Sequence, residues 1–262
     1  MIKKSKLVRY SNFISTVSNW SSYWMNKLTK QVDANYVTRK KRINIEVPSA
    51  LGGIFKEIFM DDFYELSRIN KKIDSGSVVF DVGANAGYFS IFVTEKIGPK
   101  VIHCFEPLPN NYELLSRNVN GSSLLKSKVR LNNMALTSPG PTFIDLYFST
   151  NESFSPTAST IKELEQVDNV LKVPATDLEQ YCKENNIKTI DLLKMDCEGA
   201  EYDIFFNLSK EFLLNIKNIY METHDLDKAK NTLVLGGFFK SRGYKVEIFA
   251  INDHTAMLWA EL

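Results

Sequence analysis

The chain has 262 residues, 44% of them hydrophobic, and a formal net charge of +1. This composition supports one large domain, or one domain with an extension, and it excludes global disorder. The three cysteines show no metal-ligand spacing, residues 2–10 lack the apolar run of a signal peptide, and no stretch approaches the ~18 apolar residues of a membrane span. We therefore expect a protein of the reducing cytoplasm without a transmembrane segment.

The first 45 residues differ from the rest of the chain in charge and in pattern. Residues 1–42 hold ten basic residues and one acidic residue, a net charge of +9 that leaves −8 for the remainder. We predict a basic, amphipathic extension over residues 1–45 that docks on the body of the protein or on a second subunit. Peripheral contact with an anionic membrane surface is the alternative. The face in question carries Tyr10, Phe13, Val17, Trp20, Trp24 and Leu28.

The stretch Val78–Tyr88 organises the predicted main domain, residues 46–262. It predicts a buried parallel strand over 78–82, a glycine turn, and a helix that begins at Tyr88. A dinucleotide site requires glycines where this chain has Asn85 and Tyr88, and those side chains would crowd a pyrophosphate. The turn is compatible with a ligand that carries adenosine and an amino acid but no phosphate.

The next predicted strand begins at Val101 and ends in Glu106. An acid at this distance from a glycine turn is typical of the group that accepts hydrogen bonds from both ribose hydroxyls of a bound nucleoside. Glu106 is therefore a candidate cofactor ligand.

The rest of the chain alternates between predicted helices and strands, which indicates a Rossmann-like, doubly wound α/β sheet with right-handed crossovers. A closing hairpin over 244–250 and 255–260 should place its first strand at the sheet edge. A polar loop over 149–160 is a candidate substrate loop. The other expected helices are 54–72, 109–118, 176–186, 200–214 and 226–242, and the other expected strands are 43–47, 128–136, 143–148, 170–173, 189–195 and 218–221.

Polar or glycine residues follow four of the predicted strands. In a doubly wound sheet, ligands bind at the carboxyl ends of the strands, so these residues should converge on one site. A divalent metal bound through mixed oxygen and nitrogen ligands is an alternative use of the last two strand ends. The four groups are Gly83-Ala84-Asn85, Glu106, Asp196 with Glu198, and Glu222 with His224.

Three motifs resemble those of the FkbM-type methyltransferase family, and the resemblance covers about residues 46–262. They are Asp81-x-Gly83-Ala84-Asn85-x-Gly87, Phe105-Glu106-Pro107 and Leu193-Lys194-Met195-Asp196-Cys197-Glu198-Gly199-Ala200-Glu201. Members of this family use S-adenosylmethionine, and they typically O-methylate sugar or polyketide hydroxyls. The resemblance implies a class I methyltransferase fold with a mostly parallel, seven-stranded sheet.

The resemblance also implies which residues bind the cofactor. Asn133 would pair with the adenine edge and Met134 would cover its face, while Tyr64 and Glu65 lie in a segment that often covers this site. Asp196 would contact the amino group of the cofactor or the reacting hydroxyl. The full set of predicted cofactor ligands is Asp81, Gly83, Ala84, Asn85, Gly87, Tyr88, Glu106, Pro107, Asn133, Met134 and Asp196.

Methyl transfer to an alcohol requires alignment of the nucleophile with the methyl group, together with a base for the hydroxyl proton. His224 is the first candidate for that base because its ordinary pKa lies near neutrality, and Asp196 is the second. We expect as acceptor a sugar hydroxyl of a glycan or nucleotide sugar, or alternatively a lipid or polyketide hydroxyl, and no nucleic-acid partner. A homo-oligomer is compatible with the sequence.

Two other functions fit the sequence less well. A non-catalytic, cofactor-binding interaction protein would keep the glycine turn but lose the polar residues at 196, 222 and 224, and all three are present. A dehydrogenase or epimerase would require the second glycine and a Tyr-x-x-x-Lys pair, and we find neither at the expected place.

Overall fold

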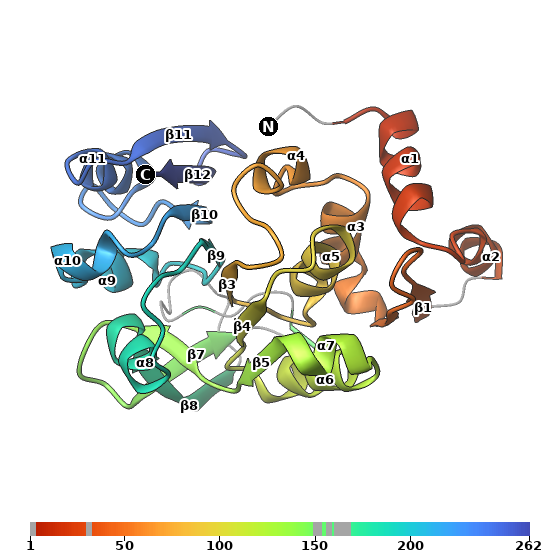
Figure 1. Ribbon diagram of the computed structural model, residues 1–262, viewed down its shortest axis with the longest axis horizontal. Coiled ribbons are helices and arrows are strands. Elements are labelled where there is room, and N and C mark those ends of the chain that lie inside the picture. The colour runs from red at the N-terminus through yellow and green to blue at the C-terminus, as the bar shows by residue number, and fades with distance from the viewer. Residues whose placement is uncertain (1–3, 30–32, 149–153, 156–158, 160–168) are drawn as a thin grey trace.

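The structure is a computed structural model that describes residues 4–29, 33–148, 154–155, 159 and 169–262. A seven-stranded sheet forms its centre, and within it β12 alone runs antiparallel to the other six strands (Figure 1). The predicted Rossmann-like, mostly parallel α/β fold is confirmed, as is the edge position of β11. In spatial order the strands are β11 Lys245–Ala250, β12 Thr255–Glu261, β10 Asn218–His224, β9 Leu192–Met195, β3 Val78–Val82, β4 Val101–Phe105 and β5 Val129–Asn132.

Side chains of the strands alternate between two cores, one on each face of the sheet. In β3, Val79 belongs to a core shared with α3 Gly52–Phe59, α5 Tyr88–Lys96 and α6 Pro109–Asn120. Its neighbour Phe80 belongs to the core on the other face, which includes α8 Leu178–Glu184, α9 Glu201–Phe206 and α11 Thr232–Lys240. Both side chains are fully buried, which explains why the strand reads as a continuous apolar run.

A three-stranded sheet lies beside the main one, in the order β6 Ala135–Thr137, β8 Asn169–Asp177 and β7 Phe143–Phe148. The single strand predicted over 128–136 is therefore wrong. The chain leaves the main sheet after Asn132 and enters the small sheet at Ala135. A short helix, α7 Ser123–Lys128, comes directly before β5.

Helix α8 is capped by Asp177, whose Oδ1 accepts the Gln180 amide at 2.8 Å, so the cap lies one residue later than expected.

Three helices are shorter than the sequence predicts. The helix expected over 54–72 divides into α3 and α4 Leu66–Ile69 because Asp62 and Glu65 between them adopt positive φ angles. The helix expected over 200–214 ends at α9, and Ser209 caps a separate turn, α10 Lys210–Leu213. The helix expected over 226–242 begins only after Asn231, its capping residue.

The N-terminal segment forms α1 Lys6–Thr16, α2 Ser21–Thr29, β1 Ala34–Val37 and β2 Asn44–Val47. The prediction of one continuous helical face over 7–28 is wrong, because the helix ends before Val17. That residue is fully buried and forms a β-bridge with Thr38. Phe13 packs edge-on against the ring of Phe55 in α3, so α1 docks on the body of the protein as expected. The predicted division at residue 45 falls inside β2 and stays a prediction.

Within the described ranges, no helix is both long and apolar enough to cross a membrane.

The short 3₁₀ helix η1 Ser49–Leu51 connects the N-terminal hairpin to α3. These N-terminal elements lie on the same side of the main sheet as α5 (Figure 1). They therefore belong to the layer that borders the pocket described next.

Candidate active site

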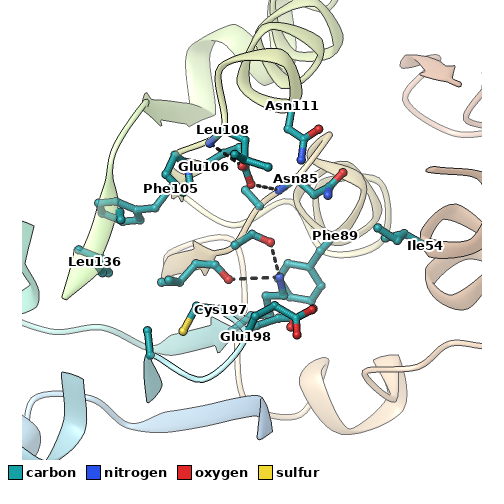
Figure 2. Close-up of a pocket in the computed structure, with 18 of the residues that line it drawn as sticks. Ile54, Asn85, Phe89, Phe105, Glu106, Leu108, Asn111, Leu136, Cys197 and Glu198 are labelled. Carbon is teal, nitrogen blue, oxygen red and sulfur yellow. Dashed lines mark hydrogen bonds between the residues drawn. The ribbon is translucent and has the colours of Figure 1, made fainter. Parts of the chain in front are cut away.

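A pocket opens at the carboxyl ends of β3, β4 and β9, where the sequence places its polar residues (Figure 2). Most of the predicted cofactor ligands line it, whereas Asp81, Gly87 and Asn133 do not. Apolar side chains from α3 and from the small sheet, such as Ile54 and Leu146, complete the lining. The predicted residues that line the pocket are Gly83, Ala84, Asn85, Tyr88, Glu106, Pro107, Met134 and Asp196.

The two glycines of the turn are required by its geometry. Gly83 has φ +69°, and a Cβ there would lie 1.8 Å from the carbonyl oxygen of Asp196. Gly87 has φ +81°, and its Cβ would lie 2.5 Å from a methyl group of Leu115. A side chain at Gly83 would therefore force apart the ends of β3 and β9, which together form one wall of the pocket.

The side-chain carboxylate of Glu106 holds the glycine turn by binding a backbone amide of that turn. Its Oε2 accepts the Asn85 amide at 2.8 Å and its Oε1 accepts the Leu108 amide at 2.9 Å (Figure 2). Burial raises the pKa of Glu106 to about 7, although these two hydrogen bonds and the charge of Lys194 oppose the shift. Each carboxylate oxygen keeps a second lone pair, so the predicted ribose contact stays open to it.

Asn133 fixes the turn that follows β4. Its Nδ2 donates to the carbonyl oxygens of Glu106 at 2.9 Å and Pro107 at 3.2 Å. Its neighbour Met134 lines the pocket. The adenine contact assigned to this pair stays a prediction.

Lys194 is a pocket residue to which the sequence analysis assigns no role. Its Nζ lies 3.2 Å from Asp81 Oδ1 and donates to the carbonyl oxygen of Gly83 at 2.8 Å. Burial alone would lower the pKa of Lys194, but the charges of Asp81 and Asp196 outweigh it and raise that pKa. The sequence signal was a lysine within the apolar strand 192–195, since a buried charge requires a partner.

Asp81 therefore supports the pocket from behind. It is fully buried, and Ser90 at the start of α5 donates its hydroxyl to Oδ2 at 2.7 Å. Tyr64, a candidate from the family resemblance, is also buried and lines the pocket with its ring 5.8 Å from Lys194 Nζ. Glu65 beside it is absent from the residues described as lining the pocket.

Most of the predicted substrate loop over 149–160 lies outside the described residues. Of its described members, Ser155 and Ser159 are buried and Phe154 is partly buried. The carbonyl oxygen of Ser155 accepts Asn111 Nδ2 at 2.7 Å and Asn85 Nδ2 at 3.3 Å, and Ser159 donates its hydroxyl to the carbonyl oxygen of Glu198. The loop thus contacts the glycine turn and the end of β9, which supports a role near the ligand.

A second hollow adjoins the pocket and shares Asp196, Glu198 and Tyr64 with it. Glu57 of α3 and Glu222 of β10 complete its acidic wall. Burial and the charge of Asp196 raise the pKa of Glu222 to about 8, and the same two causes raise the pKa of Glu57. These carboxyl groups therefore oppose one another's ionisation, and Glu222 is largely protonated at neutral pH.

His224 lies within this acidic group, because β10 continues through residues 222–224 instead of ending at 221. Its Nε2 is 3.1 Å from Glu198 Oε2, and its Nδ1 is 3.3 Å from Glu201 Oε1. Burial would lower the pKa of His224, but the hydrogen bond to Glu201 and the charges of Glu201, Glu198 and Asp196 raise it to about 10. The ring is therefore protonated at neutral pH and must lose that proton before it can act as a base.

Residues 81–246 match the family described as the Methyltransferase FkbM domain. The chain belongs to the FkbM methyltransferase family. It is therefore a methyltransferase, and S-adenosylmethionine is its methyl donor. The resemblance seen in the three sequence motifs is confirmed.

Two curated relatives illustrate the range of this match. Methyltransferase 1 of Beauveria bassiana is 30% identical over 202 residues, which cover 71% of this chain and 80% of that protein. The 31-O-demethyl-FK506 methyltransferase FkbM of Streptomyces tacrolimicus is 28% identical over 220 residues, covering 74% of this chain and 81% of that protein.

Solved structures are more distant. Methyltransferase FkbM from Methylobacillus flagellatus KT is 12% identical, with a TM-score of 0.47 over 72% of this chain and 44% of that one. TrmK of M. capricolum in complex with S-adenosyl-homocysteine is 15% identical, with a TM-score of 0.44 over 76% of this chain and 67% of that one. Family membership rests on the sequence matches and not on these low structural scores.

Proposed function

We propose that this FkbM methyltransferase transfers the methyl group of S-adenosylmethionine to a hydroxyl oxygen of a sugar, in a glycan or a nucleotide sugar. The observation that carries the proposal is the position of Asp196, which lines both the predicted cofactor pocket and the adjoining acidic hollow. A group in that position faces the methyl donor from one side and the acceptor from the other.

The acidic hollow supports a polyol as acceptor. Four carboxylates line it, those of Glu57, Asp196, Glu198 and Glu222. An ionised carboxylate accepts hydrogen bonds from hydroxyl groups, and a protonated carboxyl such as that of Glu222 can also donate one. The wall is therefore complementary to a sugar, whose hydroxyls both donate and accept. A phosphate of a nucleotide sugar would have to lie away from this wall, because like charges repel at short range.

In the proposed reaction, the bond between sulfur and the methyl carbon breaks as the bond between the hydroxyl oxygen and that carbon forms. The hydroxyl proton passes to Asp196, or to His224 once that ring has lost its own proton, and the sulfonium becomes the neutral thioether of S-adenosylhomocysteine. Because the sulfonium is already a good leaving group, alignment of donor and acceptor supplies most of the remaining rate enhancement. A positioned base contributes typically about 10²–10⁴-fold.

A polyketide or lipid hydroxyl is the second candidate acceptor. The relative from Streptomyces tacrolimicus is named for 31-O-demethyl-FK506, which supports oxygen as the atom methylated. Apolar side chains such as Ile54, Ile58 and Phe63 also border the acidic hollow, and they could contact an apolar acceptor.

The test is transfer of an isotope-labelled methyl group to a panel of nucleotide sugars, extracted glycans and hydroxylated polyketides, with NMR to locate the methyl group. We expect O-methylated sugar from the wild type and little product from Asp196→Asn. Methylation of nitrogen or carbon, or no transfer to any hydroxyl by a protein that binds S-adenosylhomocysteine, would contradict the proposal.

A further inference from the structure

We propose that Asp196, Glu198 and His224 together bind one divalent cation of the Mg²⁺ or Mn²⁺ class at the acceptor side of the site. This inference rests on the proposed function, because the cation would meet the hydroxyl of the acceptor. One ligand atom from each of the three residues lies within 4.8 Å of the other two. Bonds of ~2.1 Å to one ion place its ligand atoms roughly 3 to 4 Å apart, so a small closure of the group would suffice.

The contact between Glu201 and Nδ1 of His224 orients the imidazole ring as a metal ligand. Nδ1 lies 3.3 Å from the carboxylate of Glu201, at the start of α9, and Nε2 faces Glu198 at 3.1 Å. A bound cation would displace the Nε2 proton of the imidazolium. With Nδ1 still donating to Glu201, the freed lone pair of Nε2 would then point to the carboxylates of the cluster. A carboxylate behind the ring is the usual partner of a metal-binding histidine, because it fixes both the tautomer and the ring orientation.

Glu201 needs a positive charge beside it, which the protonated His224 ring supplies and which a bound cation would have to replace when it displaces the Nε2 proton. Its side chain is fully buried, and its Oε2 has no hydrogen-bond partner among the described residues. A buried carboxylate is costly unless an opposite charge compensates it. A cation on the far side of the His224 ring would supply that charge through the imidazole.

The wall of the acidic hollow points to the same class of ligand. Besides Asp196 and Glu198, it includes the carboxylates of Glu57 and Glu222, and none of the described residues that line it is lysine or arginine. The nearest buried lysine, Lys194, already contacts Asp81 and two backbone carbonyls. Carboxylate oxygens with one imidazole are a donor set that suits Mn²⁺ and, through its oxygens, Mg²⁺.

The cation would have a definite task in methyl transfer. Three protein ligands leave other coordination positions open, which water or two neighbouring hydroxyls of a sugar could fill. A metal ion that binds a hydroxyl oxygen acts as a Lewis acid and lowers the pKa of that hydroxyl. The same ion would hold the acceptor in line with the methyl group.

The experiment uses the full chain, freed of metal with a chelator and titrated with Mn²⁺, while EPR follows the free ion. We expect one Mn²⁺ site per chain and at least tenfold weaker Mn²⁺ binding in Asp196→Asn and Glu198→Gln. Glu201→Gln should lower the Mn²⁺ affinity by roughly 10–100-fold, because Glu201 orients the His224 ring. Glu113→Gln removes an exposed carboxylate of α6 and should bind like the wild type. Thermal unfolding checks that each variant is folded.

A measurement on the unaltered protein makes the result independent of the variants. The chain has three histidines, His103, His224 and His254, and bound Mn²⁺ should broaden the NMR signals of His224 first. The inference is overturned if Mn²⁺ leaves these signals unchanged, or if the variants bind it as tightly as the wild type.

The outcomes also separate this inference from the proposed function. If a hydroxyl acceptor is methylated at full rate in chelator and no Mn²⁺ binds, the cation site is refuted and the proposed function stands. If Mn²⁺ binds through these residues but no hydroxyl acceptor is methylated, the cation site is supported and the proposed function fails.

Discussion

Replacing Glu106 is the most direct test of how the pocket recognises its cofactor. In the structure this carboxylate accepts the amides of Asn85 and Leu108, and it is predicted to accept the two ribose hydroxyls as well. Glu106→Ala should weaken binding of S-adenosylhomocysteine by about 1.5–3 kcal/mol, the range for hydrogen bonds to a charged group. That loss corresponds to a roughly 10- to 150-fold higher Kd in isothermal titration calorimetry.

The raised pKa of Glu106 adds a dependence on pH that Glu106→Gln should remove. The pKa lies at about 7, and the ionised form is the better acceptor for ribose hydroxyls. Affinity should therefore be constant well above pH 7 and fall below it, by at most about tenfold per unit, until it levels off near the affinity of the uncharged variants. Glutamine keeps the size of the side chain but does not titrate, so its binding curve should be weaker and flat over this range.

Without cofactor, the raised pKa of Glu106 makes the folded protein less stable as the pH rises, whereas cofactor affinity increases with pH. The pKa is raised from 4.5 in the unfolded chain to about 7 in the folded one, so the unfolded chain releases its proton first as the pH rises. This residue should thus lower the free energy of unfolding between about pH 4.5 and 7. The reasoning is refuted if Glu106→Ala binds S-adenosylhomocysteine as the wild type does, or if wild-type and glutamine variants share one pH profile.

Three further substitutions test the wall of the pocket and its chemistry. Gly83→Ala should lower the Tm sharply because its Cβ would meet a backbone carbonyl at 1.8 Å, whereas Gly237→Ala, with nothing within 4 Å, should not. Lys194→Met leaves Asp81 as a buried charge and should cost about 3–5 kcal/mol in urea unfolding. Adding Asp81→Asn should recover much of that loss, and no recovery would show that the pair is not coupled. His224→Ala should slow single-turnover methylation by about 10²-fold, with the affinity for S-adenosylhomocysteine unchanged; an equal rate would exclude His224 from the chemistry.

Local sequence patterns were enough to predict the order of the central elements and the sheet edge that carries the candidate site. Val78–Val82 is buried on both faces, so its apolar run is a local signal of a parallel strand. The glycines at 83 and 87 mark a turn that only a residue without a Cβ can form there. Polar residues after apolar strands identify the carboxyl ends, because unpaired charges are rare in strand interiors that are buried on both faces.

Where local signals were weak, tertiary contacts decided the structure. The sequence pattern of residues 128–136 predicts one strand, yet the chain passes from one sheet to the other at Asn133. The side chain of Asn133 donates to backbone carbonyls of the turn that follows β4. Helices predicted from periodicity were cut short by positive φ angles at Asp62 and Glu65. Periodicity reports which face is apolar, but the end of an element depends on caps and on neighbours that lie far away in the chain.

The chemistry of the site was decided by pairs distant in sequence. Lys194 stays charged in the core because β9 lies beside β3 and brings it against Asp81, 113 residues earlier. His224 looks like a neutral base in the sequence, but Glu198 and Glu201 at the start of α9 keep its ring protonated. A pKa depends on charges within a few ångströms, and only the folded chain determines which charges those are.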